Sequence, residues 1–435
     1  MRLIIILILL FAYKLNAQEI WTLEKCIKHA LENNITIKQS KLDVNISEKN
    51  KRTAIGNFFP SLNIGASHSW NSGLNQNITT GILENLTTQS ASLNSNMNID
   101  IFNGLQNIQQ LYRSNLAILA SEYQLENIKE EISLLVANAY LQILFNKETL
   151  SINRSQLKVA KEEFLIAKEQ FNTGVIPEGD VLEIEANLSA NEQEVVIIEN
   201  NYILSKFALA QLLLITDISN FEIADENYVI PDSKILELDI NTIYNLALKN
   251  RKNIKLAETN LSIAKKDLAI SKANLYPKLS GFYSYNSRVL FNSSESIKNQ
   301  LDLNAGENFG IQITVPIFNN MTNNVNIELN KINIYKNQYN LNQTKLELEN
   351  TINQAYYDVI GSLKAFEAAE KTLKASKLAY NYAKESYSNG VINTFNLMQA
   401  NTRFKNAQAT LIKNKYDYIF KLKVLEFYCG TENAF

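Results

Sequence analysis

The chain is built from two similar halves, and this internal repeat constrains its fold more than any other feature. Residues 30–62 align without gaps on residues 247–279, at an offset of 217. From Ile101 onward the offset is 216, so one residue is lost between Leu62 and Ile101. The later matches are Ile101-Phe102-Asn103 with Ile317-Phe318-Asn319, Ala139-Tyr140 with Ala355-Tyr356, and Gly174-Val175-Ile176 with Gly390-Val391-Ile392. We therefore expect a first repeat over residues 18–216, a linker over 217–237 and a second repeat over 238–435.

Few helix-breaking residues interrupt either half. The 435 residues include only 13 Gly and 5 Pro, whereas average usage would give roughly 50 of the two together. Apolar residues recur at every seventh position, as in helices that pack side by side as coiled coils. The pattern predicts a helix from about Gly104 to Phe171, on the order of 100 Å long. The seam positions are Leu111, Ile118, Leu125, Ile132 and Ala139 in the first half and Ile327, Ile334, Leu341, Leu348 and Ala355 in the second.

A glycine follows each of the two long helical patterns. Gly174 and Gly390 stand where a left-handed residue closes the last turn of a helix, and a new helical pattern begins within a few residues. Each half is therefore predicted to contain a tight helical hairpin, with its tip near residue 174 or 390.

Four segments alternate between apolar and polar residues and are predicted to be strands. They cover about 60–70 and 92–102 in the first half and about 279–291 and 308–317 in the second, with loops 71–91 and 292–307 between them. Ten residues with one apolar and one polar face suit strands of an outer-membrane barrel. A small soluble sheet with one half-buried face gives the same alternation. The Ser, Asn and Asp residues on the polar faces favour a water-filled lumen.

Four strands are too few to close a membrane barrel, and open strand edges cannot face lipid. Copies of the chain must supply the other strands, and two copies would give 8 strands whereas three would give 12. The pattern thus requires an oligomer without choosing between these numbers. The predicted fold class is α+β and mostly α: long coiled-coil hairpins form a periplasmic α-barrel, and four strands per chain contribute to a transmembrane β-barrel.

Residues 1–17 are predicted to be a secretory signal, with Arg2 before an apolar stretch from Leu3 to Phe11. The later sequence has no apolar run long enough for an inner-membrane helix. A formal net charge of −2 gives no electrostatic basis for binding nucleic acid. Cys26 and Cys429 have no metal-binding or redox spacing, so we expect both to be packing residues.

The sequence contains no signature of an enzyme. A glycine-rich phosphate loop, a nucleophile elbow and a His/Cys cluster are all missing, so we expect no catalytic residue, no cofactor and no metal site. A secreted periplasmic coiled-coil adaptor or scaffold is the alternative, because such a protein also has a signal and heptads. The four amphipathic strands argue against that alternative.

In the order and spacing of its short motifs, the chain resembles the bacterial outer-membrane efflux proteins of the TolC family. The likeness covers essentially the whole sequence after the signal. The motifs are Trp21-Thr22-Leu23-Glu24, Ala30-Leu31 and Asn33-Asn34; the junctions Phe59-Pro60-Ser61-Leu62 and Tyr276-Pro277-Lys278-Leu279; the strand exits Ile101-Phe102-Asn103-Gly104 and Val315-Pro316-Ile317-Phe318; and the tips Phe171-Asn172-Thr173-Gly174 and Tyr387-Ser388-Asn389-Gly390.

The resemblance implies a homotrimer with a 12-stranded barrel in outer-membrane lipid and a 12-helix tunnel in the periplasm of a Gram-negative cell. It also implies a passive exit duct that docks with a periplasmic adaptor, the membrane fusion protein. The energy would come from an inner-membrane pump, either an RND transporter driven by protons or an ABC transporter. The duct shape does not identify the exported substrate, since drugs, metal ions and proteins leave through similar ducts.

The resemblance also assigns a periplasmic gate to the helix tips. Tyr387 and Asp180 match an aromatic residue and an aspartate that form a latch in such proteins. Ile392 stands where the best-known member has a basic residue, so the ionic part of that latch is missing. Asn396 and Gln399 replace the paired aspartates that attract cations to the entrance. Lipidation is not expected, because Gln18 follows the predicted cleavage site.

Overall fold

A computed structural model describes residues 20–76, 81–218, 220–224, 234–291 and 293–430. The predicted signal and residues 225–233 of the predicted linker lie outside these ranges. The chain forms two compact units, and each unit takes segments from both halves of the sequence. Unit 1 comprises Met1–Lys41, Gln124–Ile254 and Thr344–Phe435, and unit 2 comprises Leu42–Tyr123 and Lys255–Gln343.

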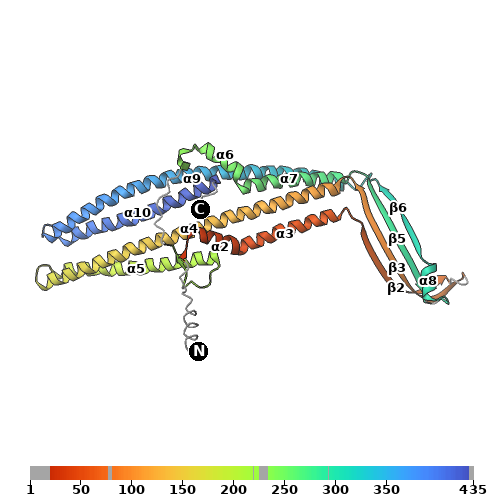
Figure 1. Cartoon of the computed structure of the whole chain (residues 1–435), viewed down its shortest axis with the longest axis horizontal. Coiled ribbons are helices and arrows are strands. Elements are labelled where there is room, and N and C mark those ends of the chain that lie inside the picture. Colours follow the sequence, from red (N-terminus) through yellow and green to blue (C-terminus); the bar gives the residue numbers. More distant parts are fainter. Residues whose placement is uncertain (1–19, 77–80, 219, 225–233, 292, 431–435) are drawn as a thin grey trace, which may run out of the picture. The chain divides into compact units, whose positions relative to one another are not determined.

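Two helical hairpins dominate unit 1. Helix α4 (Gln106–Asn172) turns back into α5 (Glu178–Leu213), and α9 (Thr322–Ser388) turns back into α10 (Thr394–Cys429) (Figure 1). The long helices have 67 residues each and the returning helices have 36 each. The helix predicted from about Gly104 to Phe171 is therefore confirmed to within two residues. No helix among the described residues is both long and apolar enough to cross a membrane.

Shorter helices precede each hairpin, and their lengths also recur. Helices α2 (Leu23–Asn33) and α6 (Ile240–Asn250) have 11 residues, and α3 (Ile35–Gly56) and α7 (Lys252–Ala273) have 22. Helix α2 begins where the Thr22 hydroxyl accepts a hydrogen bond from the Lys25 N–H, and the Asp239 carboxylate caps α6. The connection between α5 and α6 contains β4 (Glu222–Ile223), which pairs in parallel with β1 (Ile20–Trp21), and the 3₁₀ helix η1 (Lys234–Glu237).

Unit 1 has two main apolar cores. Trp21, Tyr140 and Phe221 belong to the first core, together with Cys26. The second core includes Cys429 and joins α6, α9 and α10. Both cysteines are buried and free, as the sequence predicts for packing residues. Burial raises the pKa of the Cys429 thiol to about 11, so the thiol stays protonated at neutral pH.

Unit 2 contains one antiparallel sheet, whose strand order is β2-β3-β5-β6 (Figure 1). The strands are β2 (Ser61–Gln76), β3 (Leu83–Asn103), β5 (Lys278–Leu290) and β6 (Gly306–Thr314). Strands β2 and β6 form the two edges. The four predicted strands are present, but three of the predicted boundaries, the end of β2, the start of β3 and the end of β6, are wrong in ways that have physical causes.

The predicted loop 71–91 is mostly strand, because β2 and β3 stay paired as far as Gln76 and Leu83. Backbone pairing does not require apolar side chains, and polar contacts such as Asn75 Nδ2 to the Leu86 carbonyl (2.9 Å) support this stretch. The last strand stops at Thr314 rather than near residue 317. Pro316 has no N–H to donate to a neighbouring strand, which prevents the pairing from continuing.

The predicted loop 292–307 contains a short helix, α8 (Ile297–Leu303). Strand β5 extends beyond the end of its pairing with β6, so the last residues of β5 have no strand partner on the β6 side. Helix α8 lies beside these residues. The buried Gln300 side chain accepts a hydrogen bond from the Leu290 N–H (2.8 Å) and donates one to the Leu290 carbonyl (3.1 Å). Asn304 Nδ2 donates to the Arg288 carbonyl (2.7 Å). Side-chain amides thus take the place of a strand along this edge.

Polar side chains connect the helical part of unit 2. Ser47 of α3 bonds to Ser121 of α4 (2.8 Å), and Asn330 of α9 donates to Ser271 of α7 (2.6 Å). Arg113 of α4 forms an ion pair with Asp267 of α7, so these two helices are also neighbours. The helices therefore lie side by side in the order α3, α4, α7, α9, which is the order of the strands they continue into.

Candidate functional site

Both hairpin tips are closed by the same backbone device. Gly174 has φ +76° and Gly390 has φ +70°, which is the left-handed conformation predicted for these positions. The Gly174 N–H bonds to the Phe171 carbonyl (2.9 Å) and the Val175 N–H to the Gln170 carbonyl (2.8 Å). Gly390 and Val391 make the equivalent bonds to Tyr387 and Ser386. This paired pattern satisfies the last carbonyls of a helix and reverses the chain within a few residues.

Tyr387 and Ile392 pack against the same small core at the second tip. Both are partly buried against a small core of Tyr380, Leu397 and Ala400. The Tyr387 hydroxyl accepts a hydrogen bond from the Thr394 hydroxyl (3.4 Å), which lies across the tip in the same hairpin. Ile392 therefore contributes apolar packing where the family resemblance would place a charge.

Asp180 lies in the first turn of α5, together with Glu178. Pro177 precedes this helix and makes no side-chain capping bond, so the two carboxylates supply the negative charge that favours a helix N-terminus. The Asp180 side chain has no hydrogen-bond or ion-pair partner among the described residues. At the other tip, the Asn393 side chain caps α10 by accepting from the Asn396 N–H (3.0 Å).

Asn396 and Gln399 are exposed and line an open groove between α9 and α10. Arg403 lines the same groove, and its guanidinium donates to the Gln399 side-chain oxygen (3.1 Å). Of the three residues Asn396, Gln399 and Arg403, the charged one is therefore a cation. The described residues contain no group of three or more His, Cys, Asp or Glu that would hold a metal ion.

A polar network that was not predicted from the sequence links the two hairpins along their helices, a short distance from the tips. The Tyr380 hydroxyl of α9 donates to Glu163 of α4 (3.0 Å), and Lys405 Nζ of α10 donates to Asn191 of α5 (2.9 Å). The Tyr380 ring stacks on Phe404, with ring centroids 5.5 Å apart. Burial, with the Glu163 carboxylate beside it, raises the pKa of Tyr380. Burial lowers the pKa of Lys405, and Glu163 opposes that change.

The turns from strand to long helix use two consecutive left-handed residues. Gly104 and Leu105 have φ of 66° and 68°, and Asn320 and Met321 have φ of 52° and 63°. A side chain at Gly104 would collide with the Ala273 carbonyl and the Tyr276 side chain, so this position needs glycine for space as well as for conformation. Leu105 and Met321 are not residue types that favour this conformation, and their presence marks both turns as strained.

An asparagine pair stabilises each of these turns. Asn103 accepts a hydrogen bond from the Asn107 N–H (3.3 Å), and Asn107 Nδ2 donates to the Asn57 carbonyl at the end of α3 (2.9 Å). The second half repeats the device, with Asn323 Nδ2 donating to the Asn274 carbonyl (3.1 Å). Asn107 and Asn323 occupy equivalent positions of the repeat, and this recurrence is the feature of the sequence that could have identified them. Only the geometry shows that the side chain connects one helix to the next.

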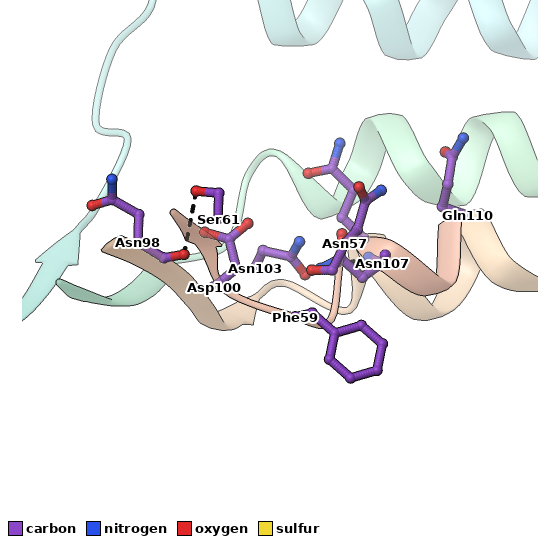
Figure 2. A pocket seen from close by; sticks show the side chains of 10 residues that line it. Asn57, Phe59, Ser61, Asn98, Asp100, Asn103, Asn107 and Gln110 are labelled. Carbon is purple, nitrogen blue, oxygen red and sulfur yellow. Dashed lines mark hydrogen bonds between the residues drawn. The ribbon is translucent and has the colours of Figure 1, made fainter. Parts of the chain in front are cut away.

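A pocket of about 430 Å³ opens at the first of these junctions. Figure 2 shows Asn57, Asn98, Asp100, Asn107 and other polar side chains gathered at the ends of β2 and β3, with the Phe59 ring pointing the opposite way. Asp100 is the only charged residue among those that line the pocket. The pocket is therefore lined mainly by side-chain amides, which bind water and neutral polar groups.

The sheet exposes one apolar and one polar face. Residues on the apolar face remain widely exposed, including Ile64 at 70%, Phe309 at 75% and Ile311 at 69%. The polar face carries Ser67 opposite Ser92 and Asn96 opposite both Asn63 and Ser284. Phe282 is the aromatic exception on that face. A Cβ on the facing Gly310 would lie 3.1 Å from the Phe282 ring, so the ring covers the glycine and protects its backbone.

Comparison with known proteins identifies the family. The family model described as outer membrane efflux protein matches residues 26–213 and residues 243–431. The outer membrane protein TolC of Salmonella enteritidis is 20% identical over 408 residues, which cover 92% of this chain and 80% of TolC. The cation efflux system protein CusC of Escherichia coli is 23% identical over 410 residues, covering 90% of this chain and 82% of CusC.

A solved structure agrees with the sequence comparison. The outer membrane channel CmeC of Campylobacter jejuni matches with a TM-score of 0.80 and 19% identity, over 94% of this chain and 85% of CmeC. This likeness extends to both the hairpins and the sheet. The chain therefore belongs to the outer membrane efflux protein family, the outer-membrane channels whose helical tunnel extends into the periplasm.

Proposed function

We propose that this chain forms the outer-membrane exit duct of a tripartite efflux system or a type I secretion system. Three copies form a passive channel, with a 12-stranded barrel in the outer membrane and a 12-helix tunnel in the periplasm. A periplasmic adaptor opens the channel at its helix tips, and an RND or ABC transporter in the inner membrane supplies the energy.

The observation that carries the proposal is the four-stranded sheet with two exposed faces of opposite character. Large apolar side chains cover one face and hydroxyl and amide groups the other, and β6 is no longer than a membrane strand needs to be. A soluble sheet would bury its apolar face against another layer. Lipid on one side and water on the other satisfy both faces.

The open edges β2 and β6 explain why several copies are needed. Neighbouring strands run antiparallel throughout, so β2 and β6 run in opposite directions. Strand β6 of one copy can then continue the antiparallel sheet by pairing with β2 of the next. Head-to-tail contacts of this kind close into a ring when the rotation between copies fits.

The proposal is tested on the full-length protein expressed in a Gram-negative host. It predicts that detergent is needed for extraction, and that unheated samples migrate as a trimer that boiling converts to monomer. The purified trimer should also form conducting channels in planar bilayers. Release by carbonate as a water-soluble protein would contradict the proposal and would favour a periplasmic coiled-coil adaptor or scaffold without a barrel.

We also propose that Tyr387 and Asp180 form a latch that holds the tips closed. Two placements support this proposal. Tyr387 lies beside the second tip. Asp180 lies in the first helical turn after the first tip, and its side chain has no partner among the described residues. The double variant Tyr387→Phe with Asp180→Asn should raise single-channel conductance in planar bilayers. Unchanged conductance would show that these two residues do not form the latch.

A further inference from the structure

The polar face of the sheet holds an arginine among uncharged residues. Arg288 of β5 lies opposite Ser92 of β3, and Ser92 lies opposite Ser67 of β2. Successive side chains of a strand alternate between its two faces, so these three residues form one row on the polar face. Neither neighbouring row contains a carboxylate, since one pairs Asn94 with Asn286 and the other pairs Ser90 with Leu290.

Four serine hydroxyls lie in this row or in the next one. Ser67 Oγ is 2.8 Å from Ser92 Oγ, and Ser69 Oγ is 3.1 Å from Ser90 Oγ. The Arg288 guanidinium donates a hydrogen bond to Ser90 Oγ (3.4 Å). A serine hydroxyl can rotate its single O–H toward a ligand. Arg288 and the four serines, which we call the arginine–serine cluster, therefore present hydrogen-bond donors together on one face.

The charge of this cluster is not neutralised within the part of the chain that the structure describes. Arg288 is exposed and forms no ion pair with a described residue. A guanidinium has five N–H donors, and the bond to Ser90 uses one of them. The remaining donors match the oxygen atoms of a carboxylate or phosphate, which arginine binds through two parallel hydrogen bonds. The cluster thus has the chemistry of an anion site.

The backbone beneath Arg288 is held on both sides. Strand β3 pairs with it on one side, whereas β6 begins at Gly306, opposite Asn286, and does not reach it on the other. Helix α8 takes the place of β6, because Asn304 Nδ2 donates to the Arg288 carbonyl (2.7 Å). The buried Ser287 hydroxyl also donates to the Leu301 carbonyl of α8 (2.8 Å). Arg288 therefore projects from a fixed position, as a binding residue requires.

We propose that the arginine–serine cluster is an anion-binding site in the lumen of the duct. It takes the carboxylate or phosphate groups of solutes that pass through. This inference rests on the proposed duct, which places the polar face toward water and the apolar face toward lipid, so a solute and not a lipid headgroup is the occupant. Three copies place three clusters around one lumen, and rings of arginine favour anions in a pore.

Binding of inorganic phosphate tests the site in the full-length trimer, purified in a phosphate-free detergent. The unmodified protein should broaden the phosphorus NMR line of phosphate. Arg288→Gln should raise the phosphate concentration that half-saturates this effect about tenfold, as expected when a charge-assisted hydrogen bond is lost. The double variant Ser90→Ala with Ser92→Ala keeps the charge and should weaken binding by a smaller factor. Lys298→Gln, which removes an exposed charge from α8 outside the cluster, should leave binding unchanged.

Ion selectivity in planar bilayers tests whether the site faces the ion path. In a gradient of potassium chloride, Arg288→Gln should shift the zero-current potential toward the potassium value relative to the unmodified channel. Arg288→Lys should not shift it, because the charge remains, although phosphate binding should weaken with the loss of the planar fork. The salt should be kept near 0.1 M, where the screening length is about 10 Å. Lys298→Gln is again the matched control.

The outcomes separate this inference from the function on which it rests. Equal phosphate binding by Arg288→Gln and the unmodified trimer would overturn the site, and so would an equal loss in Lys298→Gln. Phosphate binding that depends on Arg288 without any shift in potential would show that the cluster does not face the ion path. If Arg288→Gln forms no heat-sensitive trimer, Arg288→Lys decides, and unweakened binding would overturn the site. If the unmodified chain forms no conducting trimer, the proposed duct itself fails.

Discussion

Gly361 lies deep within helix α9, where glycine is an unfavourable residue. A Cβ added there meets no other atom within 4 Å. Because glycine in a helix interior costs roughly 0.5–1 kcal/mol relative to alanine, Gly361→Ala should raise the thermal midpoint of the helical circular-dichroism signal by about 1 °C. Gly390→Ala is the matched control, since its surroundings are equally open but its φ is +70°.

The control should lower the midpoint, because alanine at a left-handed position is strained. If Gly361→Ala also lowers the midpoint, another copy of the chain must occupy the space beside Gly361. The two variants together therefore report whether backbone conformation or an intermolecular contact explains this glycine.

Tyr380 is the residue we expect to hold the two hairpins together above their tips. Tyr380→Phe keeps the stacking on Phe404 and removes only the hydroxyl that bonds to Glu163. The expected loss is about 1 kcal/mol of stability. A double-mutant cycle with Glu163→Gln should show coupling of similar size, measured from thermal unfolding. Tyr382→Phe, on the exposed side of the same helix, is the control and should change the stability little. Equal losses of stability in the two variants would show that the bond to Glu163 does not stabilise the hairpins.

The sequence predicted some residues of the candidate site and missed others for a physical reason. The left-handed tips at Gly174 and Gly390 were predictable, because the requirement lies in the local backbone. The bond between Tyr380 and Glu163 depends on how two long helices are rotated against each other. A heptad pattern places the apolar seam but does not say which polar side chains meet beside it.

Among the elements, the helices were predicted more closely than the strands. The seven-residue repeat runs from Leu111 to Ala139 inside α4 and no Gly or Pro interrupts that helix, whereas the outer parts of β2 and β3 lack the alternation that marks a strand. Pairing across the hairpin extends these strands without help from their side chains. Helix α8 was missed because its seven residues are stabilised by the edge of β5 rather than by a pattern of their own.

Helix α8 should therefore depend on the Gln300 side chain. Gln300→Leu preserves the approximate volume but leaves the Leu290 N–H without its partner, at a cost of about 1–3 kcal/mol. Proteinase K should then cleave the segment from residue 293 to residue 305 faster in the detergent-solubilised protein. Lys298→Ala on the exposed side of α8 serves as the control. Equal cleavage of both variants and the unmodified chain would show that the edge contacts do not hold α8 in place.

At the scale of the whole molecule, one order of neighbours governs both the helices and the strands. Helices α3, α4, α7 and α9 follow the order of β2, β3, β5 and β6, so a contact between copies at the strand edges brings α9 beside α3 of the next copy. Within the chain, Lys266 of α7 lies over the Tyr112 ring of α4, with Nζ 5.0 Å from the ring centroid. The repeat offsets of 217 and 216 convert this contact to Lys49 of α3 and Glu328 of α9, two exposed and opposite charges that we expect to meet there. Exposed ion pairs contribute only about 0.2–1 kcal/mol each, but a ring of three copies repeats the pair at every contact.

Lys49→Glu and Glu328→Lys should each lower the temperature at which the detergent-solubilised trimer dissociates, because each places like charges together. The double variant should recover most of the loss, since it restores an opposite pair with the positions exchanged. Raising the salt concentration should reduce the differences between the variants, as screening weakens exposed charge pairs. The readout is migration of trimer and monomer on gels after incubation at stepped temperatures. If the double variant is as unstable as the sum of the single ones, Lys49 and Glu328 do not meet and the helices of neighbouring copies pack in a different alignment.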